Sequence, residues 1–269
     1  MPQEKKPIFS LILINFKSAD LLEQALVSLK QNRDFDEMAE IILVNNDCGE
    51  EKKVARLAKK FSCVLIPTCE NKGFGASINR ASREARGIYI GCINPDVEYR
   101  AGSLKNLDRF FKKYPKIGIV GARLIDKASL AEKWSVGTNP SLFALFRNNI
   151  GLFSDRRLLK RTRPMSVGFV SGAALFIRKS VFDSLSGFDE KFFLYFEDVD
   201  LCFRAKKEGF LIATFPSLIF FHKGGMSHES RYSQKKLFYE SQEKYFMKHR
   251  PMWEYVLLKS AKKLMRIPF

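Results

Sequence analysis

Two short stretches of the sequence carry acids in positions where they could do chemistry. In the first, the apolar run Ile90–Ile93 gives way to Asn94, Pro95 and Asp96. An Asn-Pro pair opens turns readily, so Asp96 could be an ordinary turn residue. If the turn lies at the carboxyl edge of an α/β sheet, Asp96 could instead bind Mg²⁺ together with phosphate oxygens of a substrate.

In the second stretch, Glu197 and Asp198 open a predicted helix. Acids at a helix N-terminus are common because they complement the helix dipole, which would explain one or two of them without any catalysis. A carboxylate in a partly apolar wall can also act as a general base, and aromatic faces pack against sugar rings. The aromatic residues just before the acids are Phe192, Phe193, Tyr195 and Phe196.

The spacing inside that second stretch also predicts its packing. Asp200 can pair with Arg204 one helical turn later, and Leu201 and Ala205 share the inward face. We therefore expect a helix that presents acids at its start and is anchored by an internal ion pair.

Polar residues follow the other apolar runs of the chain as well. Each of them is more often a turn former than a ligand, because Asn, Asp and Gly favour turns. Five such groups on one edge of one sheet predict a polar crevice. The groups are Asn15; Asn45, Asn46 and Asp47; Asn71 with Gly73; Asn94 with Asp96; and His222 with Gly224 and Gly225.

The segment NKGFGASIN, residues 71–79, invites comparison with the dinucleotide-binding fingerprint. It follows the third predicted strand and has Ile78 in place of the third glycine, so we reject the match. Gly73 and Gly75 could still allow the backbone to approach a ligand closely. His222 could supply a metal ligand, for which Mn²⁺ is also suited, or could simply be a satisfied histidine at a strand end.

The elements that must position these residues alternate in the first part of the chain. Short apolar runs predict buried strands, and helical patterns with inward leucines lie between them. This alternation predicts a parallel sheet flanked by helices, with the carboxyl ends of its strands at one edge. The predicted strands are Ile8–Ile14, Glu40–Val44, Cys63–Pro67 and Ile88–Ile93, and the predicted helices begin after Ser18 and span Glu51–Phe61 and Gly75–Ala85.

Beyond Tyr99 the pattern is less regular. The residues Ile125–Pro164 have weak periodicity, and their basic part Arg147–Arg163 is predicted to be a mobile loop that could act as an active-site lid. Further elements are predicted as helices at Ser103–Tyr114, from Lys179 and from Glu197, and as strands at Ile117–Gly121, Phe169–Ile177 and Leu211–Phe221.

Composition limits the class of protein. The chain has 269 residues, 46% of them apolar, and a formal net charge of +17, which predicts attraction to an anionic partner. Its five cysteines form no C-x-x-C pair, so we expect neither a zinc knuckle nor a disulfide framework, and a reducing compartment. The N-terminus lacks a signal-peptide core, and the apolar runs are shorter than the roughly 20 residues of a membrane span.

The segment from Ser233 onward is basic and contains interleaved aromatic residues, which predicts one or two amphipathic helices. These helices could pack on the rest of the protein with a solvated charged face. They could also lie on an anionic membrane, where each Lys or Arg adds about 1 kcal/mol of binding.

The ordered motifs resemble those of family 2 glycosyltransferases with the GT-A fold, in the pattern of the bacterial rhamnosyltransferase-like branch. The resemblance covers about residues Ile8 to Ser227. Singly the motifs are weak, but in this order and spacing they are highly specific. They are ILINF, ILVNN, ENKGFGASIN, GIYIGCINPDV, VSGAALFIRKSVFDSLSGFDEKFFLYFEDVDLCFRAKKEG and FHKGGMS.

The resemblance implies an α/β, GT-A architecture: a Rossmann-like, mostly parallel sheet flanked by helices, with a C-terminal helical extension. It implies a glycosyltransferase domain at 1–230, with a nucleotide-binding part at about 1–98 and an acceptor-binding part at about 99–230. A basic amphipathic helical extension then occupies 231–269.

The resemblance also implies a nucleotide-sugar donor, an acceptor hydroxyl and inversion at the anomeric carbon. Carried over position by position, Asp198 matches the catalytic base, while Asp96 and His222 match the metal or diphosphate site. The implied cofactor is Mg²⁺ or Mn²⁺. The implied donor-binding residues are Asn15, Asn45, Asn46, Asn71, Gly73, Asn79, Asn94 and Asp96, and the acceptor-binding residues are Gly172, Tyr195 and Glu197.

This sequence departs from the family pattern at two positions. Asn94 replaces the first acid of the metal motif, and Asn45 replaces an Asp often found at the nucleoside position. Both changes bear on how tightly a metal and a nucleoside are held.

The partners that the resemblance implies are a dTDP-sugar, rhamnose first, or a UDP-sugar, and a cell-surface glycan or lipid-linked acceptor. Because members of this branch extend lipid-linked glycans at the cytoplasmic face, we expect a cytoplasmic protein lying peripherally at the inner membrane surface.

Two other functions fit part of the sequence pattern. A sugar-phosphate nucleotidyltransferase would need a glycine-rich, basic phosphate loop after the first strand, where INFKSADLL stands instead. A non-enzymatic polyanion-binding protein is supported only by the net charge, and since the chain has no recognised DNA or RNA motif we expect no nucleic-acid partner.

Overall fold

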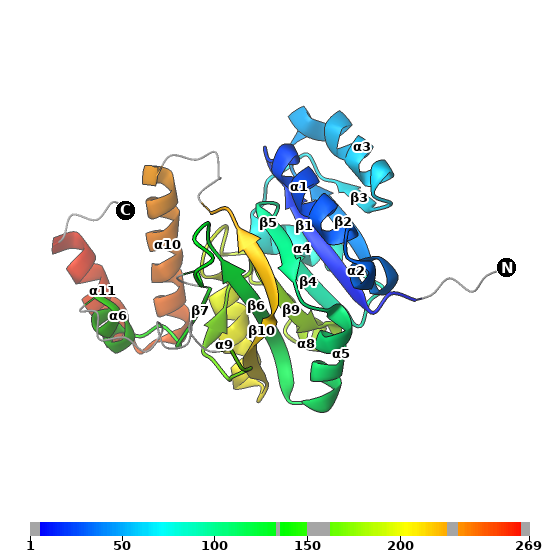
Figure 1. Cartoon of the computed structure of the whole chain (residues 1–269). Helices are drawn as coiled ribbons and strands as arrows, with labels where there is room; N and C mark the ends of the chain where they lie inside the picture. Colours follow the sequence, from blue (N-terminus) through cyan, green and yellow to red (C-terminus); the bar gives the residue numbers. More distant parts are fainter. Residues whose placement is uncertain (1–5, 133–134, 150–161, 225–230, 265–269) are drawn as a thin grey trace.

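A computed structural model describes residues 6–132, 135–149, 162–224 and 231–264. Its centre is an eight-stranded sheet with the order β3-β2-β1-β4-β9-β6-β10-β5 (Figure 1). Strands β3, β2, β1 and β4 are parallel neighbours, as the alternation of strands and helices predicts. The strands are β1 (Phe9–Asn15), β2 (Ala39–Asn45), β3 (Val64–Pro67), β4 (Tyr89–Ile93), β5 (Val97–Ala101), β6 (Ile117–Ile125), β9 (Ala174–Arg178) and β10 (Leu211–His222).

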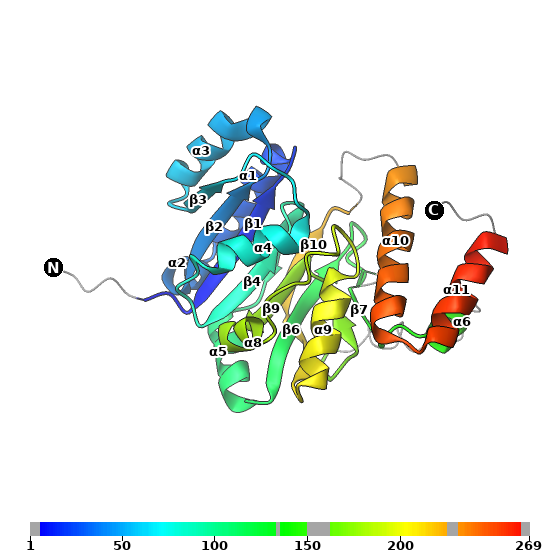
Figure 2. The same ribbon diagram turned by 180° about the vertical axis from the view of Figure 1, so that it is seen from behind.

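Helices cover both faces of the sheet (Figures 1 and 2). Successive residues of β1 illustrate the reason: Leu11 and Leu13 pack on one face and Ile12 on the other, so both faces are apolar. The first face is covered by α1 (Ala19–Lys30), α2 (Arg33–Met38), α3 (Glu51–Lys60) and α5 (Leu104–Lys113). The second is covered by α4 (Phe74–Ser82), α8 (Lys179–Ser184) and α9 (Glu197–Lys207). The predicted α/β class with a mostly parallel sheet is confirmed.

The second half of the sheet differs from the prediction in one useful way. The predicted strand Phe169–Ile177 is divided into β8 (Phe169–Val170) and β9, and β8 pairs with β7 (Val136–Gly137) in a separate two-stranded sheet. The break at 171–173 frees the Gly172 N–H group, which donates a hydrogen bond to Asp198. A continuous strand would have used that group in its own ladder.

Strands β6 and β10 run parallel to each other, and β9 lies antiparallel to both β4 and β6. The carboxyl end of β10, at His222, therefore lies on the same edge of the sheet as the carboxyl ends of β1, β2 and β4. This arrangement brings the strand-end residues from three distant parts of the chain to one edge.

The expectation that the cysteines form no disulfide is wrong for one pair. Cys48 and Cys69 are joined by a disulfide bond, with their Cα atoms 4.8 Å apart. The physical reason is strand pairing: Asn45 of β2 lies opposite Pro67 of β3, so the short 3-10 helix η1 (Cys48–Glu50) and the loop after β3 leave the sheet side by side.

The C-terminal helices α10 (Arg231–His249) and α11 (Met252–Leu264) pack beside α9, and α6 (Leu142–Asn149) lies against α11 (Figures 1 and 2). A third apolar cluster joins them, with Phe196 and Val199 from the start of α9, Tyr245 and Phe246 from α10, and Leu258 from α11. The predicted helical extension is therefore present.

Most of the predicted lid at Arg147–Arg163 lies outside the described residues, since 150–161 are not described, and 142–149 form α6. Within the described ranges, the structure has no helix that combines the length and apolarity needed to cross a bilayer.

Candidate functional site

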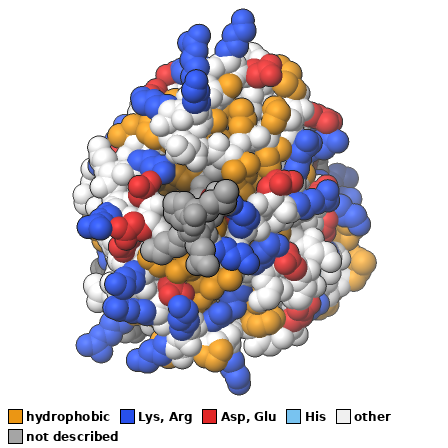
Figure 3. Space-filling view, turned by 90° about the vertical axis from the view of Figure 1, so that its right-hand side faces the viewer, with side chains coloured by type: hydrophobic (Ala, Val, Ile, Leu, Met, Phe, Trp, Pro, Cys, Tyr) orange, Lys and Arg blue, Asp and Glu red, His pale blue; other side chains and the backbone are white. Residues whose placement is uncertain are grey.

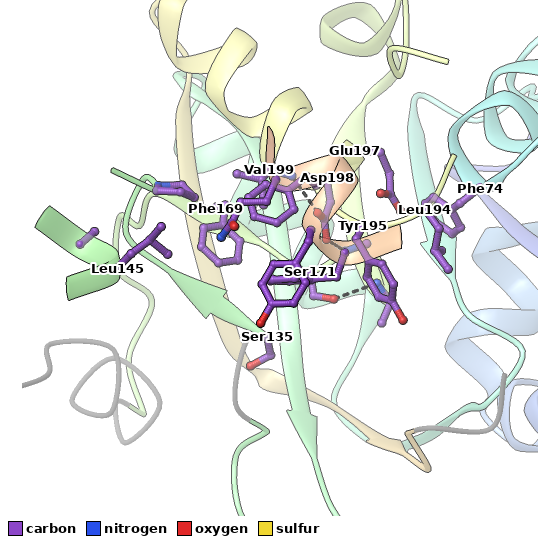
Figure 4. Close-up of a pocket in the computed structure, with 18 of the residues that line it drawn as sticks. Phe74, Ser135, Leu145, Phe169, Ser171, Leu194, Tyr195, Glu197, Asp198 and Val199 are labelled. Atoms are coloured by element: carbon purple, nitrogen blue, oxygen red, sulfur yellow. Dashed lines mark hydrogen bonds between the residues drawn. The ribbon is translucent and has the colours of Figure 1, made fainter. Parts of the chain in front are cut away.

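A cavity of about 560 Å³ lies where the start of α9, the break before β9 and the C-terminal helices meet (Figure 4). Asp198 and Glu197 line it from α9, and Asn94 and His222 line it from the ends of β4 and β10. Its opposite wall is largely apolar. That wall includes Leu145, Phe169, Phe196, Phe238, Leu258 and Ala261.

The turn before α9 sets the direction of the two acids. Tyr195 and Phe196 both have left-handed backbone conformations, with φ angles of 68° and 65°. Side chains with a Cβ atom rarely adopt this conformation, and such residues concentrate at functional sites. The buried ring of Phe196 packs on Phe238 and Tyr245 of α10, which holds the turn in place.

Asp198 is partly buried, and among the described residues its carboxylate accepts hydrogen bonds from backbone groups. Its Oδ2 accepts a hydrogen bond from the Gly172 N–H at 2.8 Å, and its Oδ1 accepts one from the Val199 N–H at 2.8 Å. Burial raises the pKa of Asp198, and these N–H groups partly offset that effect because they stabilise the charged form. No cationic side chain of the described residues forms an ion pair with it.

Glu197 lies beside it in a different environment. Its side chain is buried, and its Oε2 has no hydrogen-bond partner among the described residues. Burial, followed by repulsion from Asp198, raises the pKa of Glu197 well above the ordinary value. Since Asp198 has N–H donors for its charge and Glu197 Oε2 has none, the pair ionises at Asp198 first.

The predicted metal residues form a second cluster at the same edge. His222 Nε2 lies 3.3 Å from Asp96 Oδ2, and His222 Nδ1 lies 2.6 Å from Glu132 Oε2. Burial disfavours the charged imidazole, but hydrogen bonds to the two carboxylates outweigh it and raise the pKa of His222 to about 10. His222 and Glu132 line the cavity, and Asp96 lies next to His222.

This cluster has donors that suit a divalent cation, which would displace a proton from the His222 ring on binding. One carboxylate oxygen and one imidazole nitrogen are donors that Mn²⁺ accepts, and Mg²⁺ or Mn²⁺ at phosphate sites keeps few protein ligands because water and phosphate complete its shell. The bond from Glu132 to the far ring nitrogen is the contact that usually orients a metal-binding histidine. Among the described residues, however, the structure has no group of three or more ligating side chains arranged around one point.

The predicted nucleoside residues lie together at the ends of β1 and β2, where they are buried and bonded to one another. Asn15 donates to Asn45 at 2.8 Å and to Glu50 at 3.0 Å. Asn46 donates to Ser77 at 2.8 Å and accepts from the Thr68 hydroxyl at 2.7 Å. These hydrogen bonds fix the shape of the sheet edge. They also occupy side-chain donors and acceptors, so few are left to bind a ligand.

The remaining predicted donor residues have local structural contacts. Asn71 accepts a hydrogen bond from the Gly73 N–H, which closes the turn before α4. Gly73 has a φ angle of 98°, and a Cβ atom there would lie 2.4 Å from the Phe193 carbonyl oxygen. The backbone that comes close to Gly73 is therefore the aromatic segment before α9. Asn79 bonds both backbone groups of Phe188 and lies outside the cavity lining.

The structure thus brings six of the predicted site residues to one cavity. They are Asn94, Gly172, Tyr195, Glu197, Asp198 and His222. Sequence reasoning missed Glu132 and the C-terminal wall of the cavity. Glu132 lies in the weakly periodic part of the chain, where no local signal marks it, whereas the aromatic residues of α10 were visible as an interleaved pattern.

Basic side chains are spread out on the face of the molecule that Figure 3 shows. On the face shown in Figure 3, Lys and Arg side chains are scattered around the periphery and interleaved with Asp and Glu. This distribution differs from the continuous basic stripe typical of nucleic-acid-binding proteins.

Comparison with known proteins agrees with this geometry. A family model described as Glycosyl transferase family 2 matches residues 10–186. A curated protein of Mycobacterium tuberculosis, N-acetylglucosaminyl-diphospho-decaprenol L-rhamnosyltransferase, is 26% identical over 236 residues, which are 80% of this chain and 76% of that protein. The low-salt glycan biosynthesis hexosyltransferase Agl10 of Haloferax volcanii is 22% identical over 203 residues, 74% of this chain and 62% of that protein.

Solved structures show the same fold. The mannosyltransferase PcManGT of Pyrobaculum calidifontis, in complex with GDP-Man and Mn²⁺, superposes with a TM-score of 0.63 at 16% identity, covering 96% of this chain and 70% of that one. GalNAc-T7 with UDP, GalNAc and Mn²⁺ gives a TM-score of 0.64 at 14% identity, covering 91% and 48%. These likenesses confirm the predicted GT-A architecture.

Proposed function

The chain belongs to glycosyl transferase family 2, and we propose that it transfers a sugar from a nucleotide diphosphate to a hydroxyl group of a lipid-linked glycan, with inversion. That it is a glycosyltransferase follows from the family and its relatives. The observation that carries the finer proposal is the pair of neighbouring acids, Glu197 and Asp198, whose environments separate their pKa values at the wall of one cavity.

Asp198 is proposed as the general base. Its carboxylate takes the proton of the acceptor hydroxyl as that oxygen forms a bond to the anomeric carbon, and the bond from that carbon to the nucleotide diphosphate breaks with its electron pair. A single displacement of this kind inverts the anomeric centre. The absence of an ion pair is useful here, because a bound cation would lower the basicity of the carboxylate.

Glu197, Tyr195 and Gly172 are proposed to bind the acceptor. Glu197 in its protonated form can donate a hydrogen bond to a sugar oxygen, and this accounts for its buried and unpartnered Oε2. Gly172 has no side chain and so leaves space beside Asp198. A Cβ atom at this position would fill that space, 3.3 Å from Phe74 and 3.6 Å from the Asp198 Cβ.

Asp96 and His222 are proposed to hold Mg²⁺ or Mn²⁺ against the donor diphosphate, with Glu132 orienting the imidazole. The metal, when bound, would neutralise charge that develops on the leaving diphosphate. Two of the similar structures contain Mn²⁺. Asn94 lies beside this cluster, and the buried Asn15, Asn45 and Asn46 would shape the floor under the nucleoside.

The donor and acceptor are proposed from the relatives and from the cavity. The name of the Mycobacterium tuberculosis relative gives rhamnose as its sugar and a decaprenol-linked acceptor, so dTDP-rhamnose is the first donor to test and a UDP-sugar the next. The apolar wall formed with α10 and α11 suits an acceptor that carries a lipid. Action on such an acceptor would bring the protein to a membrane surface.

The test is a transfer assay with a panel of nucleotide sugars and a polyprenyl diphosphate-linked N-acetylglucosamine, with and without Mg²⁺ or Mn²⁺. We expect one donor to give a glycosylated product whose anomeric configuration, read by NMR, is opposite to that of the donor. A product with retained configuration, or release of pyrophosphate from a nucleoside triphosphate without transfer, would contradict the proposal.

A further inference from the structure

Helices α6 and α11 turn large apolar side chains outward at the end of the molecule. Phe143 of α6 is 68% exposed, and Trp253 and Leu264 of α11 are 59% and 86% exposed. Phe146, Met252, Val256 and Leu257 are comparably exposed. The two helices lie side by side in both views of the fold (Figures 1 and 2). We call these seven side chains the apolar end face.

The inward face of α11 carries charged residues instead. Glu254 and Lys262 are only 4% and 2% exposed, and they lie two helical turns apart with Leu258 between them. In an ordinary surface helix the charged face points to water and the apolar face to the core. In α11 two charged residues point inward beside Leu258, and most of the large apolar side chains point outward.

Specific hydrogen bonds fix this orientation of α11. Glu254 Oε2 accepts from the Leu142 N–H of α6 at 2.9 Å, which also joins the two helices. Lys262 Nζ donates to the Tyr239 carbonyl of α10 at 2.7 Å and lies 3.3 Å from Glu243. Rotating α11 to bury its apolar residues would break these bonds and expose the cavity wall, so the outward apolar face is a built feature.

Cations border the same face. Lys259 and Lys263 are exposed on α11 next to Val256, and Arg147 lies beside Phe143 on α6, with the guanidinium 5.5 Å from the ring centre. The whole chain carries a net charge of +17. Two copies of such a chain repel each other, whereas an anionic surface attracts it. The charge therefore favours an acidic lipid surface over a second copy as the partner.

We propose that the apolar end face is the surface by which this protein lies on a bilayer that contains anionic lipids. Phe143, Trp253, Leu257 and their neighbours insert at the boundary between headgroups and acyl chains, and Lys259 and Lys263 contact the headgroups. Leu258 and Ala261 of the same helix line the cavity that contains Asp198. α11 thus stands between the bilayer and the site, so a lipid-linked sugar reaches Asp198 along it.

This inference deepens the proposed function, but it is tested without any substrate. Vesicles of phosphatidylcholine alone and of phosphatidylcholine with 30% phosphatidylglycerol are mixed with the full chain and floated on a density gradient. We expect binding to the anionic vesicles that is weakened by salt. The double variant Trp253→Gln/Leu257→Gln should lower the partition coefficient roughly tenfold or more, since it removes two inserted side chains.

A matched control separates insertion from a general loss of surface hydrophobicity. Ile88→Gln/Leu130→Gln removes two exposed apolar side chains away from α6 and α11, and it should float like the unaltered chain. Circular dichroism and thermal melting of both double variants check that they fold. Equal flotation of the two variants, or no flotation of the unaltered chain, would overturn the proposal.

Fluorescence gives a second readout in the folded protein. The chain has two tryptophans, so Trp134→Phe leaves Trp253 as the only indole. On addition of anionic vesicles its emission should shift to shorter wavelength, and lipids brominated on the acyl chain should quench it. An unshifted and unquenched Trp253 would contradict insertion.

Two further measurements distinguish the alternatives. If the face instead joins two copies of the chain, sedimentation will show an oligomer that Leu257→Gln dissociates, with vesicle binding unchanged. Transfer to a short-chain, water-soluble acceptor should be unaffected in Trp253→Gln/Leu257→Gln, while transfer to a long-chain acceptor in vesicles falls. Failure of all transfer with intact vesicle binding would refute the proposed function and leave the membrane surface standing.

Discussion

Two aspartates, Asp198 and Asp200, lie on opposite faces of the first turn of α9, and their surroundings shift their pKa values in opposite directions. Asp198 faces the cavity, where its carboxylate accepts hydrogen bonds from two backbone N–H groups, and burial raises its pKa. Asp200 faces away and is fully buried against three basic side chains: Arg204 at 2.7 Å, Lys248 at 2.6 Å and His249 at 2.6 Å. Burial alone would raise the pKa of Asp200, but His249, Arg204 and Lys248 lower it to about 2.

This difference shows how one helix separates chemistry from stability. Lys248 and His249 belong to α10, so the ion cluster around Asp200 ties the C-terminal extension to α9. The same docking carries Phe238 and Tyr239 of α10 to the wall of the cavity beside Asp198. Because the ion cluster at Asp200 anchors α9, the face that carries Asp198 can remain without a cation.

The largest expected effect is on the cavity side. Asp198→Asn removes the proposed base but keeps the volume of the side chain and an oxygen that can accept from an N–H group. We expect kcat to fall by about 10³-fold or more, with donor binding unchanged within error and no loss of thermal stability. Turnover assays, donor titration calorimetry and thermal melts measure the three quantities. Unimpaired turnover would remove Asp198 from its proposed role.

Asp200→Asn should have the reverse profile. It leaves three basic groups around a neutral side chain, so the free energy of unfolding should fall by about 3 kcal/mol. Urea unfolding of the variant and of Asp198→Asn under the same conditions provides the comparison. Equal stability of the two variants would show that the two faces do not differ as described.

The pH dependence of stability should separate the two acids further. The folded pKa of Asp200 is lowered, so its stabilising contribution is full above the unfolded value near 3.8 and is lost as the pH falls toward 2. The lost contribution is of the order of 2 kcal/mol, because the pKa is lowered from 3.8 to about 2. Asp198 has the opposite sign: its folded pKa is raised, so its ionisation begins to destabilise the fold above the unfolded value near 3.8, and the effect is complete above the folded value.

Unfolding free energies measured between pH 2 and pH 5 test this prediction. The slope over that range should be smaller in Asp200→Asn than in the unaltered chain, and it should be equal or steeper in Asp198→Asn. An unchanged slope in Asp200→Asn would mean that other carboxylates account for acid unfolding.

Glu197→Gln should have the smallest effect. A carboxamide has nearly the shape of a protonated carboxyl group and can also donate a hydrogen bond, so kcat should change by less than about tenfold. Removal of the acid next to Asp198 should leave thermal stability equal or slightly higher. A loss of activity as large as that of Asp198→Asn would indicate that Glu197 works in its charged form.

Local patterns were enough to predict much of this molecule. The alternation of strands and helices predicted the parallel half of the sheet, and the spacing in α9 predicted the Asp200–Arg204 pair. The ends of β4 and β10 were also expected at one edge. All these features follow from periodicity over a few residues and from the handedness of crossovers.

The unpredicted features depend on contacts between distant segments. The N–H donor to Asp198 is Gly172, which lies at a break that the apolar run Phe169–Ile177 conceals. Glu132 contacts His222 across 90 residues, and the Cys48–Cys69 bond depends on the pairing of β2 with β3. The outward apolar face of α11 depends on which side of the helix packs against α10. The sequence pattern alone does not indicate which side that is.

The most direct test of the account is a crystal structure of Asp198→Asn with a nucleotide sugar and an acceptor analogue. We predict that the acceptor hydroxyl lies within about 2.6–3.2 Å of the residue 198 side chain, on the side of the anomeric carbon opposite the diphosphate. An acceptor hydroxyl bound away from residue 198, or on the same side as the diphosphate, would contradict the account.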